Sequence, residues 1–375
     1  MIDKKLFIGL MSGTSMDGID AVLVDLSTHA FIAGHMRPYS TDVKSCLNAV
    51  LSGELTDLKA FSQLNTLLGR EFAKAALELM AKANVSSTAI KAIGSHGQTL
   101  CHDATADIPY TVQLACAHTI AELTGVTVVA DFRTRDLIVG GQGAPFAPLY
   151  HQALFKGQEY PLAVINIGGI ANISYLSNEF TVRGYDLGPG NCLMDAWIHY
   201  QLDQDYDKNG AWAASGKVIK PLLEKLLTDP YFNQKPPKSI GKEYFSLEWL
   251  ATHLSPAYAP VDVQATLLML TASVIVQELK KETKRPVRAL FCGGGVHNRA
   301  LLDLLAALLP EVQITSTQAL GIDPDYVEAM MLAWLAEKTL TNTSLDLKPI
   351  TGAKHATILG AIYPAGIDKG NWLRV

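Results

Sequence analysis

Residues 8–25 read IGLMSGTSMDGIDAVLVD, two apolar runs joined by a short polar turn. The first run begins at Leu6, the second extends from Ile19 to Leu26, and glycine, serine, threonine and aspartate occur in the turn between them. Apolar runs separated by turn-forming residues predict a β-hairpin. The pattern returns near the middle of the chain, where an apolar run leads through Gly168 and Gly169 into a second one. A strand, a turn and a strand at the start of each half predict two related lobes.

Helices and strands alternate along the rest of the sequence. Apolar residues recur at helical spacing over 58–83 and 261–284, which predicts two long helices, and 287–292 is typical of a buried strand. Asn298 is placed to cap the helix that follows it, and Asp323, which precedes a proline, predicts the start of another helix. This alternation predicts an α/β fold with mixed sheets flanked by helices.

A chain of 375 residues exceeds the size at which one hydrophobic core usually stops growing, so two lobes are expected. The glycine- and proline-rich stretch LIVGGQGAPFAP, residues 137–148, predicts a bend that passes between them. We therefore expect a boundary near Gly140, with an N-terminal lobe over 1–140 and a C-terminal lobe over 141–375. The C-terminal helix is free to return to the first lobe in this scheme.

Composition restricts the classes of function. The chain is 49% hydrophobic and 18% charged, with a net charge of −5 and no lysine or arginine cluster, which argues against nucleic acid as a partner. The apolar run at 6–11 is too short for a signal peptide, and no membrane span is expected. The five cysteines are scattered without a C-x-x-C pair, so neither a disulfide framework nor structural zinc is expected, and a reducing cytoplasm fits best.

Three glycine-rich turns contain the residues best suited to bind phosphate. The turn at 12–18 offers successive backbone N–H groups and hydroxyls, and the carboxylates of Asp17 or Asp20 can hold Mg²⁺ directly or through water. The turns at 166–172 and 293–298 each follow a strand, and the second of them opens a helix whose amides and dipole favour an anion. By composition alone, the turn at 12–18 fits an ordinary polar hairpin equally well.

Neither the phosphate-loop motif G-x-x-x-x-G-K-[ST] nor the dinucleotide motif G-x-G-x-x-G occurs in the chain. Glycine turns in both halves instead predict a nucleotide clamped between two lobes. The candidate nucleotide-binding residues are Ser12, Gly13, Thr14, Ser15, Met16, Asp17, Gly18, Ile19, Asp20, Gly168, Gly169, Asn172, Gly293, Gly294, Gly295 and Asn298.

Further motifs accompany these turns: SHGQT (95–99), DFRTRD (131–136), GGQGAP (140–145), NIGGIANI (166–173), DLGPGNCLMDAW (186–197) and CGGGVHN (292–298). Together with the opening stretch, and in this order from Ile8 to about Ile362, they resemble the family of anhydro-N-acetylmuramic acid kinases. We see no departure at the motif positions.

This resemblance implies a two-lobed, actin-like (ribonuclease H-like) ATPase fold with a central nucleotide cleft, the cofactors ATP and Mg²⁺, and a homodimer. Members of the family act on 1,6-anhydro-N-acetylmuramic acid, a sugar released from the cell wall, and yield N-acetylmuramic acid 6-phosphate and ADP. Because O6 of this sugar is tied to C1 in an ether bridge, the reaction must open the bridge with water while O6 receives the γ-phosphoryl group.

The resemblance also implies the catalytic residues. Asp186 matches the base that activates water, a role that typically contributes about 10²–10⁴-fold to the rate. From spacing alone, however, Asp186 reads more readily as a turn-forming aspartate before a Gly-Pro-Gly bend. Glu328 matches a glutamate near the metal and phosphate that acts through a magnesium-bound water, whereas its plain reading is an exposed helical glutamate.

The motifs SHGQT and DFRTRD resemble the sugar-binding walls of the family. An arginine suits a lactyl carboxylate because its planar fork can pair with both oxygens. Arg133 and Arg135 are equally compatible with an internal ion-pair network around Asp131 or Asp136. The candidate sugar-binding residues are His96, Gln98, Thr99, Arg133, Arg135 and Asp136.

Two other functions fit the same fold. In an ordinary sugar kinase, Asp186 would deprotonate a substrate hydroxyl instead of water. In a non-catalytic, nucleotide-switched binding module, ATP would control partner binding and no sugar would be consumed.

Overall fold

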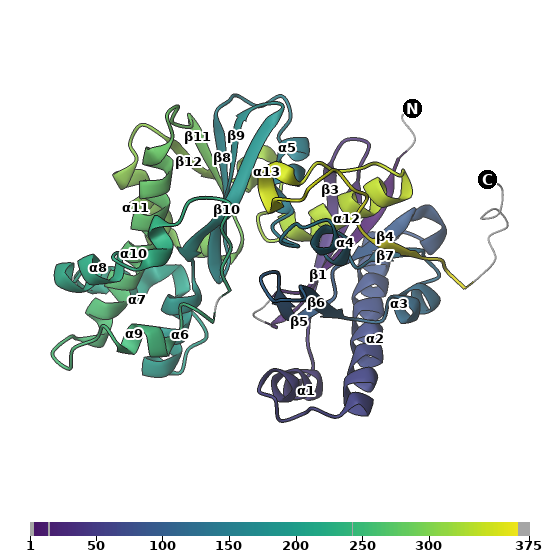
Figure 1. The fold of residues 1–375 in the computed structure, drawn as a ribbon, viewed down its shortest axis with the longest axis horizontal. Helices are drawn as coiled ribbons and strands as arrows, with labels where there is room; N and C mark the ends of the chain where they lie inside the picture. Colours follow the sequence, from purple (N-terminus) through teal and green to yellow (C-terminus); the bar gives the residue numbers. More distant parts are fainter. Residues whose placement is uncertain (1–3, 14–15, 242, 367–375) are drawn as a thin grey trace. The chain divides into compact units, whose positions relative to one another are not determined.

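The computed structural model describes residues 4–13, 16–241 and 243–366. The chain divides into two compact units (Figure 1), a first unit of Met1–Phe146 with Tyr326–Val375 and a second unit of Ala147–Asp325. The division after Phe146 lies in the glycine- and proline-rich stretch, a few residues beyond the boundary expected near Gly140. The chain from Tyr326 onward groups with the first unit, although the sequence scheme assigned it to the second lobe apart from a returning helix.

The first unit is built around a six-stranded sheet in the order β13-β7-β4-β1-β2-β3. Strand β1 pairs antiparallel with β2 and parallel with β4, which confirms the hairpin predicted at the start of the chain. The strands are β1 Leu6–Met11, β2 Gly18–Asp25, β3 Ala30–Pro38, β4 Ala92–Ser95, β7 Val128–Ala130 and β13 Ala361–Tyr363, with a separate ribbon of β5 Gln98–Asp103 and β6 Tyr110–Leu114.

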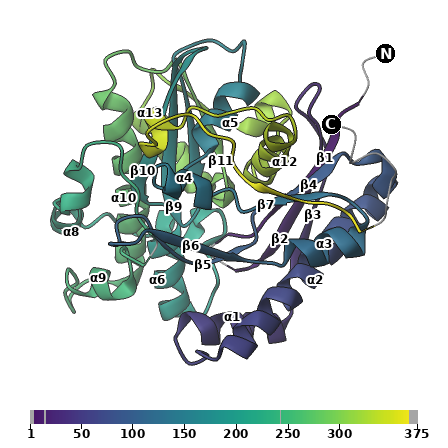
Figure 2. The ribbon, with the colours of Figure 1, turned by 45° about the vertical axis from the view of Figure 1, so that its right-hand side comes forward.

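Helices α2 and α12 cover opposite faces of this sheet (Figure 2). Ile8 and Leu10 lie in one hydrophobic cluster with the buried face of α2, whereas Gly9, between them on β1, faces α12. The predicted long helix is confirmed as α2, which Asp57 caps by accepting hydrogen bonds from two backbone amides. The helices of this unit are α1 Thr41–Leu51, α2 Leu58–Ala83, α3 Ala117–Thr124, α4 Thr134–Ile138, α12 Val327–Leu340 and α13 Lys348–Thr351.

The backbone of α12 lies directly against the sheet because glycines leave room for it. A Cβ atom added to Gly9 would lie 1.7 Å from the Ala329 carbonyl oxygen, and one added to Gly94 would lie 2.0 Å from that of Leu332. The helix predicted to follow Asp323 is confirmed as α12, but it begins at Val327, so its predicted start is wrong. The Asp323 side chain instead accepts the Asp325 N–H at 3.1 Å, which is typical of an aspartate that forms a turn.

The second unit repeats the strand order of the first. Its sheet runs β10-β9-β8-β11-β12, with both hairpins antiparallel and β8, β11 and β12 parallel. Five strands of the first sheet, β3-β2-β1-β4-β7, have the same order and the same directions. Two copies of this ribonuclease H-like arrangement confirm the predicted actin-like α/β fold. The strands are β8 Leu162–Ile167, β9 Ile170–Asn178, β10 Thr181–Pro189, β11 Arg288–Cys292 and β12 Gln313–Ser316.

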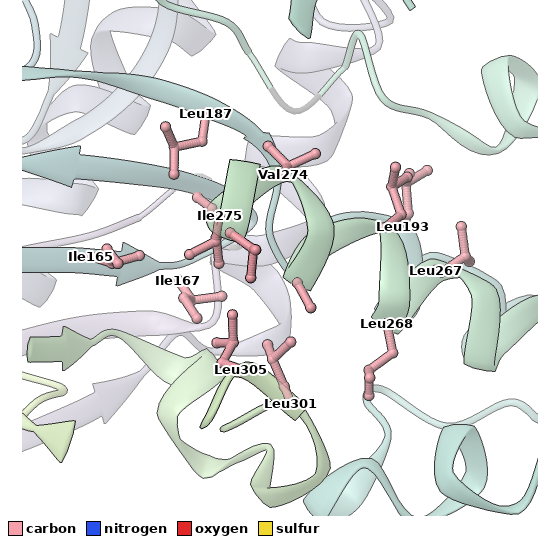
Figure 3. Close-up of a cluster of buried hydrophobic side chains, with 14 of the residues drawn as sticks. Ile165, Ile167, Leu187, Leu193, Leu267, Leu268, Val274, Ile275, Leu301 and Leu305 are labelled. Carbon is pink, nitrogen blue, oxygen red and sulfur yellow. The ribbon is translucent and has the colours of Figure 1, made fainter. Parts of the chain in front are cut away.

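The core of the second unit lies between its sheet and α10 and α11 (Figure 3). Side chains of β8, including Ile165 and Ile167, meet Ile275 of α10 and Leu305 of α11. The predicted long helix is confirmed as α10, which starts and ends close to its expected bounds. The helices are α5 Ala147–Leu154, α6 Cys192–Leu202, α7 Ala211–Ser215, α8 Lys220–Leu226, α9 Leu247–Ala251, α10 Pro260–Lys281 and α11 Arg299–Leu308.

Five short 3-10 segments complete the described elements: η1 Ser87–Ala89, η2 Lys208–Gly210, η3 Pro230–Asn233, η4 Gly294–His297 and η5 Thr317–Leu320. Within the described ranges, α10 alone has the length and apolar composition to cross a membrane, and 67% of the relevant window is buried inside the protein. Packing of α10 against α6, α7, α8, α11 and β10 is that of a core helix.

Candidate active site

Three parallel strands of the first sheet end at one edge. β1, β4 and β7 run in the same direction, so the chain leaves all three at the same side. Ser12 follows β1, His96 follows β4 and Asp131 follows β7. In α/β sheets this edge is where ligands usually bind. The sheet therefore brings together three motifs that are far apart in the sequence.

Gln98 ties the two ends of the first turn together. The Oγ of buried Ser12 lies 2.8 Å from the Gly18 carbonyl oxygen and 2.8 Å from Oε1 of Gln98. Both are acceptors, so the single hydroxyl proton serves one of them at a time. The Nε2 of Gln98 donates to the Gly13 carbonyl at 3.2 Å. Since both polar atoms of Gln98 are engaged inside the unit, this predicted sugar contact orients the turn.

The remaining residues of the first turn have different environments. Thr14 and Ser15 lie outside the described residues. Met16 takes a left-handed conformation with φ 57°, and Asp17 is exposed. Ile19, predicted to bind nucleotide, is fully buried in the hydrophobic cluster of the first unit, so only its backbone faces the turn.

Gly18 is needed for close strand pairing. A Cβ atom added there would lie 2.3 Å from the Arg37 carbonyl oxygen on β3. The glycine therefore lets β2 approach β3 directly where the turn ends.

His96 holds the guanidinium group of Arg133. The Nδ1 of His96 lies 2.9 Å from the carbonyl oxygen of Gly97, and Arg133 donates from Nε to His96 Nε2 at 3.1 Å. A carbonyl can only accept, so Nδ1 carries the proton and Nε2 accepts. Burial, and next the Arg133 charge, lower the pKa of His96 to about 3. The imidazole is therefore neutral at physiological pH and fixes the direction of the arginine.

The other predicted sugar-binding residues of this unit differ in their exposure to solvent. Arg135 is exposed, and the Thr99 hydroxyl accepts a long 3.4 Å hydrogen bond from Gln113. Asp136 is fully buried, and its carboxylate accepts from the Gly143 amide at 2.7 Å and from the Thr351 hydroxyl at 2.9 Å.

Asp136 therefore has an internal role in this structure. Burial raises its pKa, although the two hydrogen bonds act in the opposite direction. A Cβ atom at Gly141 would lie 2.3 Å from Asp136 Oδ2, which explains a glycine at this point of the GGQGAP motif. The two motifs DFRTRD and GGQGAP are thus joined through one carboxylate.

Two carboxylates of the first unit have the chemistry to hold a magnesium ion. Asp20 lies on β2 opposite Met11, and Glu328 lies in the first turn of α12, a helix that packs against β2. Both side chains are partly exposed. Carboxylate oxygens are the ligands that Mg²⁺ prefers, and it usually keeps several waters. Within the described ranges, no cluster of three or more His, Cys, Asp or Glu side chains is placed to hold a metal ion.

The second unit has its own edge of strand ends. The glycine turn between β8 and β9 is anchored by the segment that follows β10. The Gly168 carbonyl accepts the Asn191 N–H at 2.8 Å, and the Gly169 carbonyl accepts those of Gly190 and Cys192 at 2.9 and 3.1 Å. A Cβ atom at Gly190 would lie 2.4 Å from the Gly168 oxygen. The NIGGIANI and DLGPGN motifs therefore form one compact structure.

The third glycine turn follows β11 at the same edge. Gly293 has φ +78°, and a Cβ atom there would lie 2.1 Å from Asn166 Oδ1. A Cβ atom at Gly295 would lie 2.3 Å from the Ile167 side chain. Gly294 is exposed with nothing within 4 Å of an added Cβ atom. Of the three glycines, Gly293 and Gly295 are required by the fold, whereas Gly294 has open space beside it.

Asn298 is used as a helix cap. Its side chain accepts the Leu301 N–H at 3.0 Å, which confirms the predicted cap of α11. The turn reaches α11 through the 3-10 segment η4, so the glycines do not open the α-helix directly.

Asp186 lies in a row of polar side chains near the ends of the strands. It pairs with Asn172 across β10 and β9, and Asn172 pairs with Asn166 across β9 and β8. Residues directly opposite each other in a sheet point to the same face. The register shift between Asp186 and Gly188 marks a bulge in β10. Bulges of this kind often re-aim a side chain next to an active site.

Hydrogen bonds with the segment 231–240 hold Asp186. The Asp186 N–H donates to the Lys238 carbonyl at 3.1 Å, its carbonyl accepts the Tyr231 hydroxyl at 2.9 Å, and its Oδ2 accepts the Ile240 N–H at 3.0 Å. Main chain and carboxylate are therefore both fixed. An amide that donates to a carboxylate stabilises its charged form.

Sequence reasoning missed the residues that support the site. Thr351 lies 215 residues from its partner Asp136, and Ile240 lies 54 residues from Asp186. Neither residue belongs to a recognisable motif, and the contact from Ile240 to Asp186 uses a backbone amide that any residue type can supply. The local signal in this region is the run of aromatic residues between Tyr231 and Trp249, which packs as a cluster.

Comparison with known proteins gives a consistent result. Residues 5–365 match the family model described as anhydro-N-acetylmuramic acid kinase. A protein named anhydro-N-acetylmuramic acid kinase from Legionella pneumophila (strain Corby) is 55% identical over 96% of this chain and 98% of that protein. One of the same name from Coxiella burnetii (strain Dugway 5J108-111) is 45% identical over 96% of this chain and 98% of that protein.

Among solved structures, component A of (R)-2-hydroxyglutaryl-CoA dehydratase from Acidaminococcus fermentans is 12% identical. The structural match covers 88% of this chain and 96% of the dehydratase component, with a TM-score of 0.47.

Proposed function

The chain belongs to the anhydro-N-acetylmuramic acid kinase family, and we propose that it phosphorylates 1,6-anhydro-N-acetylmuramic acid with ATP. The reaction consumes one water, breaks the C1–O6 bond, forms an O6–phosphorus bond, and gives N-acetylmuramic acid 6-phosphate and ADP. The observation that carries this proposal is the match to the family over nearly the whole chain, with the family motifs other than GGQGAP located at strand ends.

Asp186 is the proposed base. Its Oδ2 accepts the Ile240 amide, and the carboxylate so oriented receives the proton that water loses as it attacks C1. The electron pair of the C1–O6 bond passes to O6, which attacks the γ-phosphorus and displaces ADP. The register shift in β10 beside Asp186 and the hydrogen bonds with 231–240 support a carboxylate held in one orientation. A positioned base typically contributes about 10²–10⁴-fold to the rate.

The glycine turns are the proposed phosphate-binding residues. In the second unit, Gly168, Gly169 and Gly294 lie at the edge where β8 and β11 end, and Gly294 has open space above it. In the first unit, the turn that begins at Ser12 is kept in shape by Gln98. Asp20 and Glu328 would hold Mg²⁺, through water for Glu328, and the ion would neutralise charge on the phosphates.

Arg133 is the proposed contact for the lactyl carboxylate of the sugar. His96 accepts from its Nε, so the remaining N–H donors of the guanidinium face away from the imidazole. Arg135 is exposed, lies two residues after Arg133, and is the second candidate for this contact. A guanidinium whose direction is fixed can pair with both carboxylate oxygens.

A coupled ADP assay tests the function. Anhydromuramic acid should release ADP in proportion to the sugar added, whereas glucose, N-acetylglucosamine and N-acetylmuramic acid should not. In ¹⁸O-water, the label should appear on C1 of the product. Phosphorylation without label would favour an ordinary sugar kinase, and ADP formation that ignores the sugar would favour a nucleotide-switched binding module.

We further propose a cytoplasmic homodimer. All five cysteines are free thiols, which suits a reducing compartment, and ATP is the phosphate donor. The support for the dimer is the family resemblance, and light scattering of the purified protein would test it.

A further inference from the structure

Lys238 is a lysine in an unusual place. Only 6% of its surface is exposed, although lysine is almost never buried unless it is paired. Its Nζ lies 3.4 Å from the Tyr231 carbonyl oxygen and 4.6 Å from the centre of the Tyr231 ring. The ammonium group is therefore held by the same segment that holds Asp186.

Titratable groups on two neighbouring elements surround this lysine. On β10, Asp186 acts on it electrostatically, and its main-chain N–H donates to the Lys238 carbonyl at 3.1 Å. On α10, Glu278 attracts the ammonium and Lys281 repels it. Glu278 is itself held by the Tyr185 hydroxyl at 2.9 Å and by Lys281 at 3.1 Å.

A positive group near a carboxylate favours ionisation of that carboxylate, whereas a negative group disfavours it. Lys238 is a buried positive charge: its ammonium lies over the ring of Tyr231, whose hydroxyl donates to the Asp186 carbonyl, and its own carbonyl accepts the Asp186 N–H. Burial lowers the pKa of Lys238, while the charges of Glu278 and Asp186 act to raise it. Glu278 and Asp186 therefore both favour the charged form of the lysine.

We propose that Lys238 is a positioning residue for the reaction, whose buried ammonium keeps the Asp186 carboxylate ionised in the orientation set by the Ile240 amide. This inference rests on the proposed role of Asp186 as the base. Lys238 touches neither sugar nor nucleotide in this assignment, and it acts through Asp186.

The test is the pH dependence of kcat/KM in neutral variants. Lys238→Met removes the charge and keeps the apolar stem, and Lys238→Gln removes the charge while its amide can still donate to the Tyr231 carbonyl. Both should move the acid limb of the profile upward by about one pH unit, the lower end of the effect of a nearby opposite charge. The KM for ATP should stay unchanged. Lys238→Arg should keep the acid limb of the wild type.

Lys235→Met is the matched control, because Lys235 is an exposed lysine of the same segment. It should have the wild-type profile. A purely structural role of Lys238 would lower the thermal midpoint and reduce kcat by the same factor at every pH, without moving the acid limb, and this result would overturn the proposal.

The Asp186→Asn variant distinguishes failure of the proposed base from failure of the proposed role of Lys238. An inactive Asp186→Asn enzyme together with a wild-type acid limb in both neutral Lys238 variants would remove the role of Lys238 alone. A nearly active Asp186→Asn enzyme would remove the proposed base, and the inference about Lys238 with it. Should Lys238→Met fail to fold, the Gln variant still gives the profile.

Discussion

Peptide groups hold Asp186 both at its main chain and at its carboxylate. Its N–H donates to the Lys238 carbonyl and its Oδ2 accepts the Ile240 N–H, while its main-chain carbonyl accepts the Tyr231 hydroxyl. A change at Asp186 itself can therefore leave the surrounding structure intact.

We expect Asp186→Asn to fold normally and to lose turnover by about 10²–10⁴-fold, since the amide oxygen still accepts the Ile240 N–H but cannot take a proton from water. The coupled ADP assay measures the rate, and calorimetric titration with an ATP analogue checks that nucleotide binding survives. A kcat within a few-fold of the wild type would contradict the role of this residue.

Two buried histidines should make stability depend on pH. Burial lowers the pKa of His96 and of His151 to about 3, from an ordinary value of 6.5. The unfolded chain therefore binds these protons more tightly, so stability is present above about pH 6.5 and is lost as the pH falls toward 3. Each group contributes up to about 1.4 kcal/mol per pH unit in that window.

Urea unfolding between pH 7 and pH 4 checks this expectation. His151→Gln should make the fall in unfolding free energy with pH shallower, because one of the two groups no longer titrates. His355→Gln, at an exposed position, should leave the slope as in the wild type. Equal slopes for all three proteins would show that His151 does not control acid stability.

At the scale of elements, some glycines are needed for packing of the fold, whereas others are free to serve ligand binding. Gly94 is required because a Cβ atom would lie 2.0 Å from the Leu332 carbonyl oxygen of α12, whereas Gly294 has nothing within 4 Å. Both are glycines at or beside a strand end, so the same substitution can be compared at the two positions.

Gly94→Ala should destabilise the protein by about 1–3 kcal/mol or more, because α12 must move away from the sheet. Gly294→Ala should leave the urea midpoint unchanged and raise the KM for ATP by about tenfold, or about 1.4 kcal/mol, if a phosphate lies against that backbone. An unchanged KM in a stable Gly294→Ala protein would remove this turn from the phosphate site.

The elements themselves were largely predictable from the sequence. Helical spacing identified α2 and α10, a capping asparagine identified the start of α11, and turn residues identified both hairpins. The start of α12 was missed because Asp323 closes a local turn and leaves the cap position to Tyr326. An aspartate before a proline has both options, and only tertiary packing selects between them.

For the whole molecule, the motifs indicated two related halves but did not indicate which segments of the chain belong to each half. The repeated strand order accounts for the two hairpins recognised in the sequence. The return of Tyr326–Val375 to the first unit depends on glycines in β1 and β4 that receive α12, a contact between distant parts of the chain. The partners of Asp136 and Asp186 were hidden for the same reason, since Thr351 and Ile240 carry no motif.

The two units should differ as isolated fragments. Residues 147–325 are continuous and contain a complete core, so this fragment should unfold cooperatively in urea. Residues 1–146 lack α12 and β13, which leaves one apolar face of the sheet uncovered. That fragment should fold only when 326–366 is joined to it by a flexible linker. Cooperative unfolding of 1–146 alone, followed by circular dichroism, would contradict this dependence.

The position of α12 near the end of the chain also has a consequence during translation. Residues 147–325 leave the ribosome before α12 does, so the second unit can complete its core first although it is encoded later than most of the first. The sheet that contains β1 and β2 can complete its packing only after α12 has been synthesised. A transcript truncated before codon 326 should therefore give a product that engages chaperones through its exposed first sheet and is degraded.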